Sequence, residues 1–154
     1  MATSFDPGPD GTTVVQQYAA PAEPFIIRNE FIGGRFHYAV QVDTTGGFDV
    51  CPADACKIED LACPVGESPP ARFEILPDHE PPDLQRYEAL LRDHGVEIAG
   101  IEYVVDREGV AYTYDINVNT NYNQTAEERA GLGGTTDAGM IAVATFLGSE
   151  LANV

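Results

Sequence analysis

The chain has 154 residues, 44% of them hydrophobic, which suits one globular domain with its own core. A formal net charge of −17, with only eight lysines and arginines, repels nucleic-acid phosphates and anionic lipid headgroups, so neither nucleic acid nor membrane is expected as a partner. The sequence contains no run of 18 apolar residues and no signal-peptide pattern, and it therefore predicts a cytoplasmic protein.

The first elements in chain order are expected to be strands. Residues 1–11 form a flexible lead rich in glycine, proline and aspartate, and the run TTVVQQYAA (12–20) predicts a strand because it contains β-branched and aromatic residues. The β-rich runs 25–33 and 35–43 meet at the pair Gly33–Gly34. A glycine pair at this point favours a hairpin, since both turn positions can then adopt positive φ.

A long loop is expected over residues 44–80, which hold five of the eleven prolines and no long periodic pattern. One short strand fits at 72–76. The loop contains the three cysteines of the chain, Cys51, Cys56 and Cys63. Their odd number and their spacing argue against a disulfide framework and against a standard structural zinc site, so reduced thiols without an assigned role are expected.

A helix and a second hairpin follow. The run 81–95 has a proline near its start, Gly95 at its expected end and apolar residues at helical spacing. Those apolar residues are Leu84, Tyr87, Leu90 and Leu91. The β-rich runs 97–106 and 110–118 then flank the short segment 107–109 and predict a hairpin.

Two further helices are expected in the last part of the sequence. Thr125 and Glu128 form a capping-box pattern that predicts a helix start. In the run 135–154, five residues fall on one helical stripe that would dock on the sheet. They are Met140, Val143, Ala144, Leu147 and Leu151. Strands grouped with peripheral helices predict an α+β fold with an antiparallel sheet and packed helices.

Polar residues gather at the end of the second hairpin, in the run YTYDINVNTNYN (112–123). Because side chains alternate along a strand, the expected polar face carries Asp115, Asn117 and Asn119, and the opposite face carries Tyr112, Tyr114 and Ile116. If Val105 pairs with Val110, Glu102 lies opposite Thr113, diagonal to Asp115 and on the polar face. A turn one residue longer would move Glu102 to the other face.

Two carboxylates and an amide oxygen on one face predict a cation site. Oxygen donors without thiolate or imidazole suit Mg²⁺ or Ca²⁺, and Mg²⁺ commonly keeps positions for water and substrate phosphates, so the set fits a magnesium–nucleotide site. The alternative is an exposed strand that simply ends in a turn rich in aspartate and asparagine, where both residue types are favoured by local hydrogen bonds. The residues alone leave both interpretations open.

The order of three runs resembles the C-terminal half of the ATP-grasp ligases, in particular the α-L-glutamate ligase-like and ribosomal-protein glutamate ligase-like members. The runs are VVQQYAA, IIRNEFIGGRFHYAVQVD and GIEYVVDREGVAYTYDINVNTNYN, and the likeness covers most of residues 13–152. The resemblance implies a C-terminal ATP-grasp-like subdomain over residues 12–154, in which the loop 44–80 lies on the substrate side.

The resemblance also implies roles for individual residues. In that family an acidic residue on the penultimate strand and a (D/E)-x-N triplet on the last strand bind the magnesium ions of ATP. The matching positions are Glu102, Asp115 and Asn117. The adenine-binding hinge strand matches the residues Gln16, Gln17 and Tyr18. An arginine that contacts the phosphates or the acyl phosphate matches Arg28, although Arg28 could instead be an ordinary strand arginine paired with Glu30.

The later asparagines lie where the resemblance places substrate contacts. These are Asn119, Asn121 and Asn123, whose amides could orient a carboxylate or an amine. They could equally cap the turn into the helix expected at Thr125.

The activity that the resemblance implies is that of an ATP-dependent carboxylate–amine ligase, in which a carboxylate is activated as an acyl phosphate and an amine then displaces phosphate. Such chemistry asks the protein for positioning and charge neutralisation. The implied cofactors are ATP and Mg²⁺, for which Mn²⁺ can substitute, and the implied substrates are a small-molecule or peptide carboxylate and an amine.

The sequence departs from the family in two places. The family's phosphate-binding lysines and glycine-rich loop lie upstream of the hinge strand, and nothing before Thr12 matches them; Asp43 stands where some relatives carry a second arginine. We therefore expect the C-terminal half of a catalytic unit, which is either a fragment, a truncated gene product, or one half that a partner chain or a second copy completes. The alternative is a non-catalytic or truncated interaction module with an exposed apolar surface.

Overall fold

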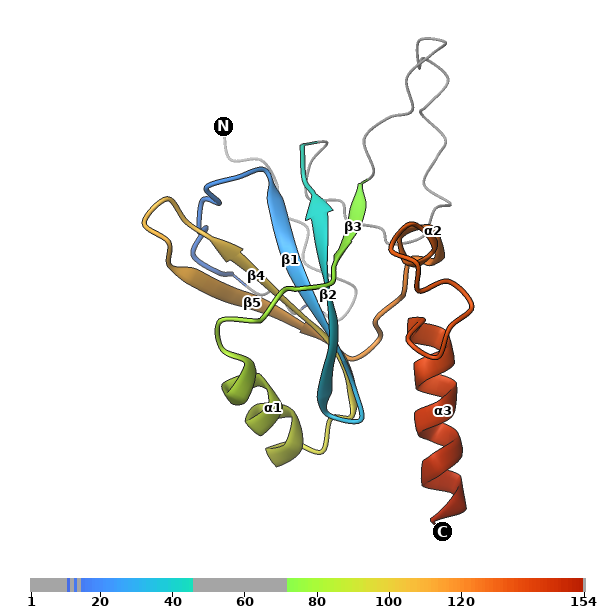
Figure 1. The fold of residues 1–154 in the computed structure, drawn as a ribbon. Helices are drawn as coiled ribbons and strands as arrows, with labels where there is room; N and C mark the ends of the chain where they lie inside the picture. The colour runs from blue at the N-terminus through green and yellow to red at the C-terminus, as the bar shows by residue number, and fades with distance from the viewer. Residues whose placement is uncertain (1–10, 12, 14, 46–71, 154) are drawn as a thin grey trace, which may run out of the picture.

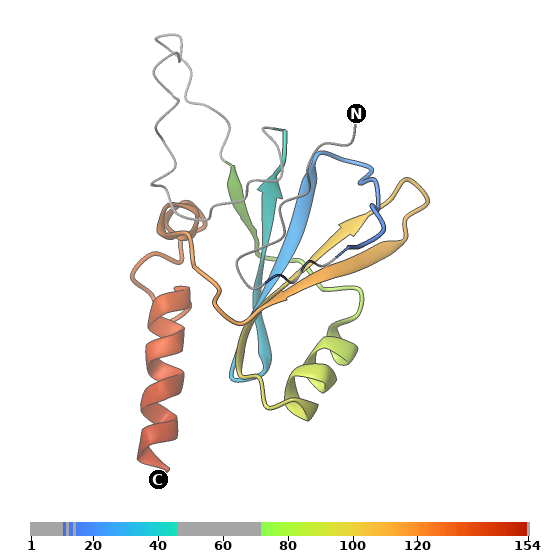
Figure 2. The same cartoon turned by 180° about the vertical axis from the view of Figure 1, so that it is seen from behind.

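The computed structural model describes residues 11, 13, 15–45 and 72–153. Its strands in these ranges are β1 (Phe25–Ile32), β2 (Arg35–Asp43), β3 (Phe73–Leu76), β4 (Ile98–Val105) and β5 (Ala111–Asn117). Its helices are α1 (Leu84–Asp93), α2 (Gln124–Arg129) and α3 (Gly139–Ala152). The strands form one antiparallel sheet in the order β3-β2-β1-β4-β5, with α1 on one side and α2 and α3 on the other (Figures 1 and 2). The predicted α+β fold is confirmed.

The β1–β2 hairpin forms as the sequence predicts. Gly33 and Gly34 have φ values of +63° and +68°, which are left-handed conformations that favour glycine. These two residues form the turn, and Ile32 and Arg35 pair on either side of it. The short strand expected near residues 72–76 is also present as β3, which pairs with β2. The three cysteines lie outside the described residues.

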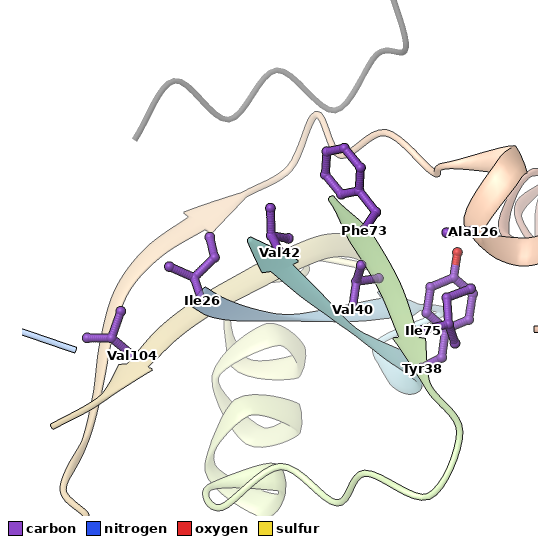
Figure 3. Packing of buried hydrophobic residues seen from close by; sticks show 8 residues of the cluster. All are labelled: Ile26, Tyr38, Val40, Val42, Phe73, Ile75, Val104 and Ala126. Atoms are coloured by element: carbon purple, nitrogen blue, oxygen red, sulfur yellow. The ribbon is translucent and has the colours of Figure 1, made fainter. Parts of the chain in front are cut away.

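The sheet is covered on both faces, and each face has its own apolar cluster. On one face, buried residues of β1, β2, β3 and β4 pack with Ala126 of α2 in the cluster drawn in Figure 3, and Tyr114 of β5 packs against this cluster. On the other face, Tyr87 and Leu91 of α1 pack on Phe31, Ala99 and Ile101. This arrangement follows from the period of two in β1 and β4, which sends alternate side chains to opposite faces. The helix expected over 81–95 is therefore confirmed, with Gly95 just past its end.

The strand predicted over residues 12–20 does not form in the part of that run that the structure describes. Residues 15–20 have no regular secondary structure, and Val15 and Tyr18 are 89% and 70% exposed. The segment passes beside the β4–β5 hairpin, where the Gln16 side chain donates to the Tyr114 carbonyl at 3.1 Å and the Ala22 amide donates to the Val105 carbonyl at 2.8 Å. Isolated bonds of this kind position a chain, but a strand needs a continuous ladder of backbone pairs.

Helix α2 begins earlier than the sequence pattern suggests. Its N-cap is Asn123, whose side-chain oxygen accepts from the Ala126 amide at 2.8 Å, and the capping box predicted at Thr125 and Glu128 is wrong. Asparagine is as good an N-cap as serine or aspartate, and because Asn123 precedes the threonine by two residues, the helix starts there with the Ala126 amide satisfied.

Helix α3 extends away from the sheet (Figure 1), and its predicted docking stripe is largely exposed. Met140, Leu147 and Leu151 are 66%, 49% and 78% exposed. The contact with the sheet is made instead through Phe146, whose ring lies against Gly33. The prediction failed because α3 is apolar on nearly every side, so sequence periodicity does not single out one face. No helix in the described ranges is long and apolar enough to cross a membrane.

A buried carboxyl group connects α2, α3 and β2. Glu127 is 4% exposed, and one of its oxygens accepts from the Tyr38 hydroxyl and from the Gly139 amide, both at 2.7 Å. Burial and the Glu127 carboxyl raise the pKa of the Tyr38 phenol, so the phenol remains a donor at neutral pH. Gly139 also allows close approach, because a Cβ there would overlap the ring of Tyr122.

We expect Tyr38→Phe to lower the free energy of unfolding by about 1.5–3 kcal/mol, because it removes a buried hydrogen bond to a carboxylate. Urea denaturation followed by circular dichroism measures the change. Tyr112→Phe is the matched control, since Tyr112 is exposed, and it should leave the midpoint unchanged. Equal effects of the two substitutions would contradict a stabilising role for the Tyr38–Glu127 bond.

The amide of Asn29 is buried in the centre of the sheet without a partner. Asn29 is fully buried on the α1 face, opposite Ala39 and Ile101, and neither polar atom of its side chain has a hydrogen-bond partner. We expect Asn29→Leu to raise the free energy of unfolding by about 1 kcal/mol or more, because a side chain of the same branched shape then replaces an unpaired, desolvated amide. Asn29→Asp should act in the opposite direction in the same urea titration, and a loss of stability in Asn29→Leu would contradict this account.

Candidate functional site

The β4–β5 hairpin places two acidic side chains directly opposite each other. Val105 pairs with Ala111, one residue later than predicted, and a bulge then shifts the register between Tyr103 and Glu102. As a result Glu102 pairs with Asp115 rather than with Thr113. The predicted proximity of the two carboxylates is therefore present, although by a different register.

The bulge also changes the face on which the tyrosines lie. Tyr103 pairs with Thr113 and Glu102 with Asp115, so Tyr114 is the extra residue of β5. Its hydroxyl donates to Glu102 Oε2 at 2.8 Å, which places it on the face of Glu102 and not on the opposite face as predicted. Tyr112, opposite Val104, is likewise on this face.

Arg28 lies beside these residues in a buried network. It pairs across the sheet with Glu102, and it is only 6% exposed. Its Nε donates to Glu30 Oε1 at 2.6 Å, and its Nη2 donates to Thr120 Oγ1 at 2.5 Å and to the Asn121 carbonyl at 2.7 Å. The Arg28–Glu30 pairing that the sequence left open is therefore present, and it leaves Nη1 facing Glu102 Oε1 at 3.9 Å.

Thr120 closes this network. Its hydroxyl donates to Glu30 Oε2 at 2.8 Å and accepts from Arg28, so the loop after β5 is tied back to β1. Burial raises the pKa of Glu30 against the lowering effect of the Arg28 charge and of the hydrogen bonds from Thr120 and Arg28. The space for this cluster exists because Gly100 has no side chain: a Cβ there would lie 3.0 Å from Arg28 Nε and 3.1 Å from Thr120 Oγ1.

The residues that the sequence predicts as cation donors, Glu102, Asp115 and Asn117, lie together on one face of the hairpin. Asn117 lies opposite Gly100 on the same face, and its side-chain oxygen accepts from the Asn119 amide at 2.8 Å, which leaves that oxygen a second lone pair. Like charges directly opposite each other on neighbouring strands destabilise a sheet, and a divalent cation between them removes that cost. Among the described residues no group of three His, Cys, Asp or Glu could hold a metal, so this set has two carboxylates and relies on an amide for its third donor.

A groove lies next to this face. Its volume is about 480 Å³, and it runs between the segment Gln16–Ala19 and the β4–β5 hairpin. All three residues that the resemblance assigns to the adenine hinge, Gln16, Gln17 and Tyr18, line it. On the hairpin side the walls are Val104, Tyr112, Thr113 and Tyr114. The groove thus has an apolar and aromatic wall, which is the character of a binding site for a flat ring.

The three later asparagines have different surroundings. Asn119 is exposed, and its backbone amide closes the turn on Asn117. Asn121 is exposed, and its carbonyl holds Arg28. Asn123 caps α2 with its side-chain oxygen, so for this residue the turn interpretation is confirmed. Asn121 and Asn123 also line a cavity of about 10 Å³ beside Arg28, Glu30 and Tyr122, too small for a substrate in this state.

Sequence reasoning missed Thr120, Tyr114 and Gly100. The sequence gives no signal for Thr120 and Gly100, because their importance depends on contacts with residues that are far away in the sequence. Strict alternation of side chains along the strand predicted the wrong face for Tyr114. The bulge at this residue contains no glycine, so nothing in the sequence indicates that the alternation is interrupted there.

Comparison with known proteins adds information on the fold. No protein-family model and no curated protein matches the sequence. Among solved structures, the macrocyclase MdnB from Microcystis aeruginosa MRC is 11% identical over 80% of this chain and 39% of its own, with a TM-score of 0.46. The ATP-grasp ligase PsnB, solved with a phosphomimetic variant of its minimal precursor, Mg and ADP, is 13% identical over 71% of this chain and 29% of its own, with a TM-score of 0.44.

A third solved structure is a RiPP-associated ATP-grasp ligase from Chryseobacterium gregarium in complex with ADP and a leader and core peptide. It is 17% identical over 73% of this chain and 34% of its own, with a TM-score of 0.40. The chain is similar in fold to parts of these ligases. It spans between 29% and 39% of their lengths, and at such identities and TM-scores the likeness concerns the arrangement of the elements alone.

We expect Gly100→Ala to lower the free energy of unfolding by about 1–3 kcal/mol, because the added methyl group displaces buried, hydrogen-bonded Arg28 and Thr120. Gly148→Ala is the matched control: Gly148 lies in α3 with nothing within 4 Å of the added methyl group, and alanine should stabilise the helix by about 0.5–1 kcal/mol. Urea titration of the two variants and the parent measures both effects. A neutral Gly100→Ala would mean that the cluster is loosely packed.

Proposed function

We propose that the face carrying Glu102, Asp115 and Asn117 binds a magnesium–nucleotide complex, and that the chain is part of an ATP-dependent carboxylate–amine ligase. The observation that carries this proposal is the direct pairing of Glu102 with Asp115, with Asn117 two residues further on the same face. Facing carboxylates on neighbouring strands are unfavourable, and a bound cation would relieve that cost, because the nearby Arg28 guanidinium is already paired with Glu30. A set of two carboxylates and one amide suits Mg²⁺, which keeps further positions for water and phosphate oxygens.

The surroundings of the carboxylates support a nucleotide rather than a bare metal ion. The groove beside Tyr114 and Tyr112 has the volume and the aromatic wall for a purine base, and Gln16, Gln17 and Tyr18 form its other side. Base and metal sites share the β4–β5 hairpin, so a single ligand can reach both. In this arrangement Gln16, Gln17 and Tyr18 bind ATP, and Glu102, Asp115 and Asn117 hold Mg²⁺ or Mn²⁺.

Arg28 takes the role of an anion-binding side chain. Three of its donors are fixed by Glu30, Thr120 and the Asn121 carbonyl, and Nη1 is turned toward Glu102 and the metal donors. A guanidinium held in this way costs little reorganisation when a phosphoryl or acyl phosphate group develops charge beside it. When bound, the metal would offset charge on phosphate oxygens. We propose that the exposed side chains of Asn119 and Asn121 contact the acid or the amine.

The whole reaction needs groups that this face lacks. Phosphoryl transfer from ATP requires charge neutralisation on the side of the nucleotide away from the sheet. We infer that a further segment of the same protein, a partner chain or a second copy provides it, and that the substrates are a small-molecule or peptide carboxylate and an amine. A non-catalytic interaction module is the second candidate function, and the observation that favours it is the exposed apolar surface of α3.

Calorimetric titration of the purified chain with ATP, with and without Mg²⁺, tests the proposal. We expect binding that requires Mg²⁺, and an affinity lowered about tenfold or more, equivalent to about 1.4 kcal/mol, in Asp115→Ala and Asn117→Ala, because each removes an oxygen donor. The matched control is Glu74→Gln, which removes one negative charge from an exposed residue of β3. It should bind as the parent does.

Two results would overturn the proposal. The first is ATP binding that is indifferent to Mg²⁺ and to both substitutions. The second is no binding at all by a chain that is folded by circular dichroism, which would favour the interaction module.

A further inference from the structure

Tyr114 contacts both parts of the proposed site. It is the bulged residue of β5, and its hydroxyl donates to Glu102 Oε2 at 2.8 Å. Its ring lines the groove and also packs against the apolar cluster that contains Val104. Its carbonyl accepts from the Gln16 side chain at 3.1 Å. Tyr114 therefore contacts both the segment across the groove, through Gln16, and the Glu102 carboxylate on the neighbouring strand.

We propose that Tyr114 is a positioning residue that fixes Glu102 for the metal and couples metal binding to nucleotide binding. This inference rests on the proposed function and names a residue that the family motif does not include. It adds a specific expectation: the two ligands should bind cooperatively, and the cooperativity should depend on the Tyr114 hydroxyl.

The first step of the argument is the orientation of the Glu102 carboxylate. A glutamate on a strand has a broad terminal torsion, so either oxygen can face a ligand. The Tyr114 hydroxyl holds Oε2, and Oε1 is then the oxygen on the side of Arg28, 3.9 Å from Nη1. Hydrogen bonds of this kind to a metal ligand typically change metal affinity by about 10–100-fold.

The second step is the connection to the groove. A base in the groove contacts the ring of Tyr114, and the Gln16–Tyr114 bond holds the opposite wall to the same residue. A nucleotide that fixes the position of Tyr114 therefore also fixes the hydroxyl that donates to Glu102. Conversely, a cation that fixes Glu102 also fixes Tyr114, which forms part of the groove wall. Coupling of this kind is reciprocal, since each ligand changes the affinity of the other by the same factor.

The decisive comparison is between Tyr114→Phe and Tyr87→Phe. The first keeps the ring and removes only the hydroxyl on Glu102. The second removes a hydroxyl that bonds Thr113 Oγ1 at 2.6 Å; Thr113 also lines the groove, but Tyr87 approaches it from α1, on the face of the sheet opposite Glu102. Mn²⁺ binding is measured by electron paramagnetic resonance, with and without ADP. ADP binding is measured by calorimetry with and without Mn²⁺, and unfolding temperatures are recorded for both variants.

In Tyr114→Phe we expect Mn²⁺ affinity in the absence of nucleotide to fall about tenfold, ADP affinity in the absence of metal to stay within about twofold, and the enhancement of ADP binding by Mn²⁺ to shrink. Tyr87→Phe should bind both ligands as the parent does. In a Glu102→Ala background, Tyr114→Phe should have no further effect on Mn²⁺, because the hydroxyl then has no carboxylate to hold. This second comparison tests the inference even if one single variant is unstable.

Contrary outcomes separate this inference from the proposed function. If Asp115→Ala loses Mn²⁺ and Tyr114→Phe does not, the positioning role is wrong and the proposed function stands. If Tyr114→Phe weakens Mn²⁺ and ADP equally and lowers the unfolding temperature, Tyr114 has only a structural role. If the parent chain binds no Mn²⁺ with or without ADP, both the inference and the proposed function fail.

Discussion

One extra residue in β5 determines which side chains the sheet presents together. Without the bulge at Tyr114, the pairing of Val105 with Ala111 would continue, and Glu102 would pair with Tyr114 and lie on the face opposite Asp115. The bulge shifts the register of β5 by one residue, so the two carboxylates lie opposite each other. It also brings the Tyr114 side chain to the same face. Bulges commonly re-aim side chains next to functional sites. The candidate cation site thus depends on a local irregularity of the backbone.

The second constraint is the burial of charge on β1. Arg28 and Glu30 are nearly inaccessible to solvent, and such a pair is costly unless every remaining donor and acceptor finds a partner. Thr120 and the Asn121 carbonyl provide those partners, which forces the chain after β5 to fold back over the sheet. The same requirement explains Gly100, because any side chain there would occupy the space that Arg28 and Thr120 fill. The loop after β5 therefore owes its position to the satisfaction of a buried ion pair.

These two constraints also explain how far the sequence alone could predict the structure. The first hairpin was predictable, since Gly33–Gly34 satisfies a local steric requirement. The grouping of Asp115 and Asn117 on one face was predictable from alternation over two residues. The position of Glu102 relative to them was not, because it depends on a turn length and a bulge that tertiary packing decides. Helix α3 was likewise predicted only in part. The periodicity of apolar residues identified the helix, but not Phe146 as the residue that contacts Gly33.

Helix α3 and the paired carboxylates place different demands on what surrounds the chain. An apolar helix that exposes Met140, Leu147 and Leu151 requires an apolar cover, and this holds for a ligase completed by a partner and equally for an interaction module. The facing carboxylates of Glu102 and Asp115 place a different demand on their surroundings. Arg28 lies 3.9 Å from Glu102 but is also paired with Glu30, so a protein partner that covered this face with apolar groups would bury more negative than positive charge. A divalent cation compensates them while leaving the face open to water and to a nucleotide. The carboxylate pair, and not the apolar helix, is therefore the feature that distinguishes the ligase from the interaction module.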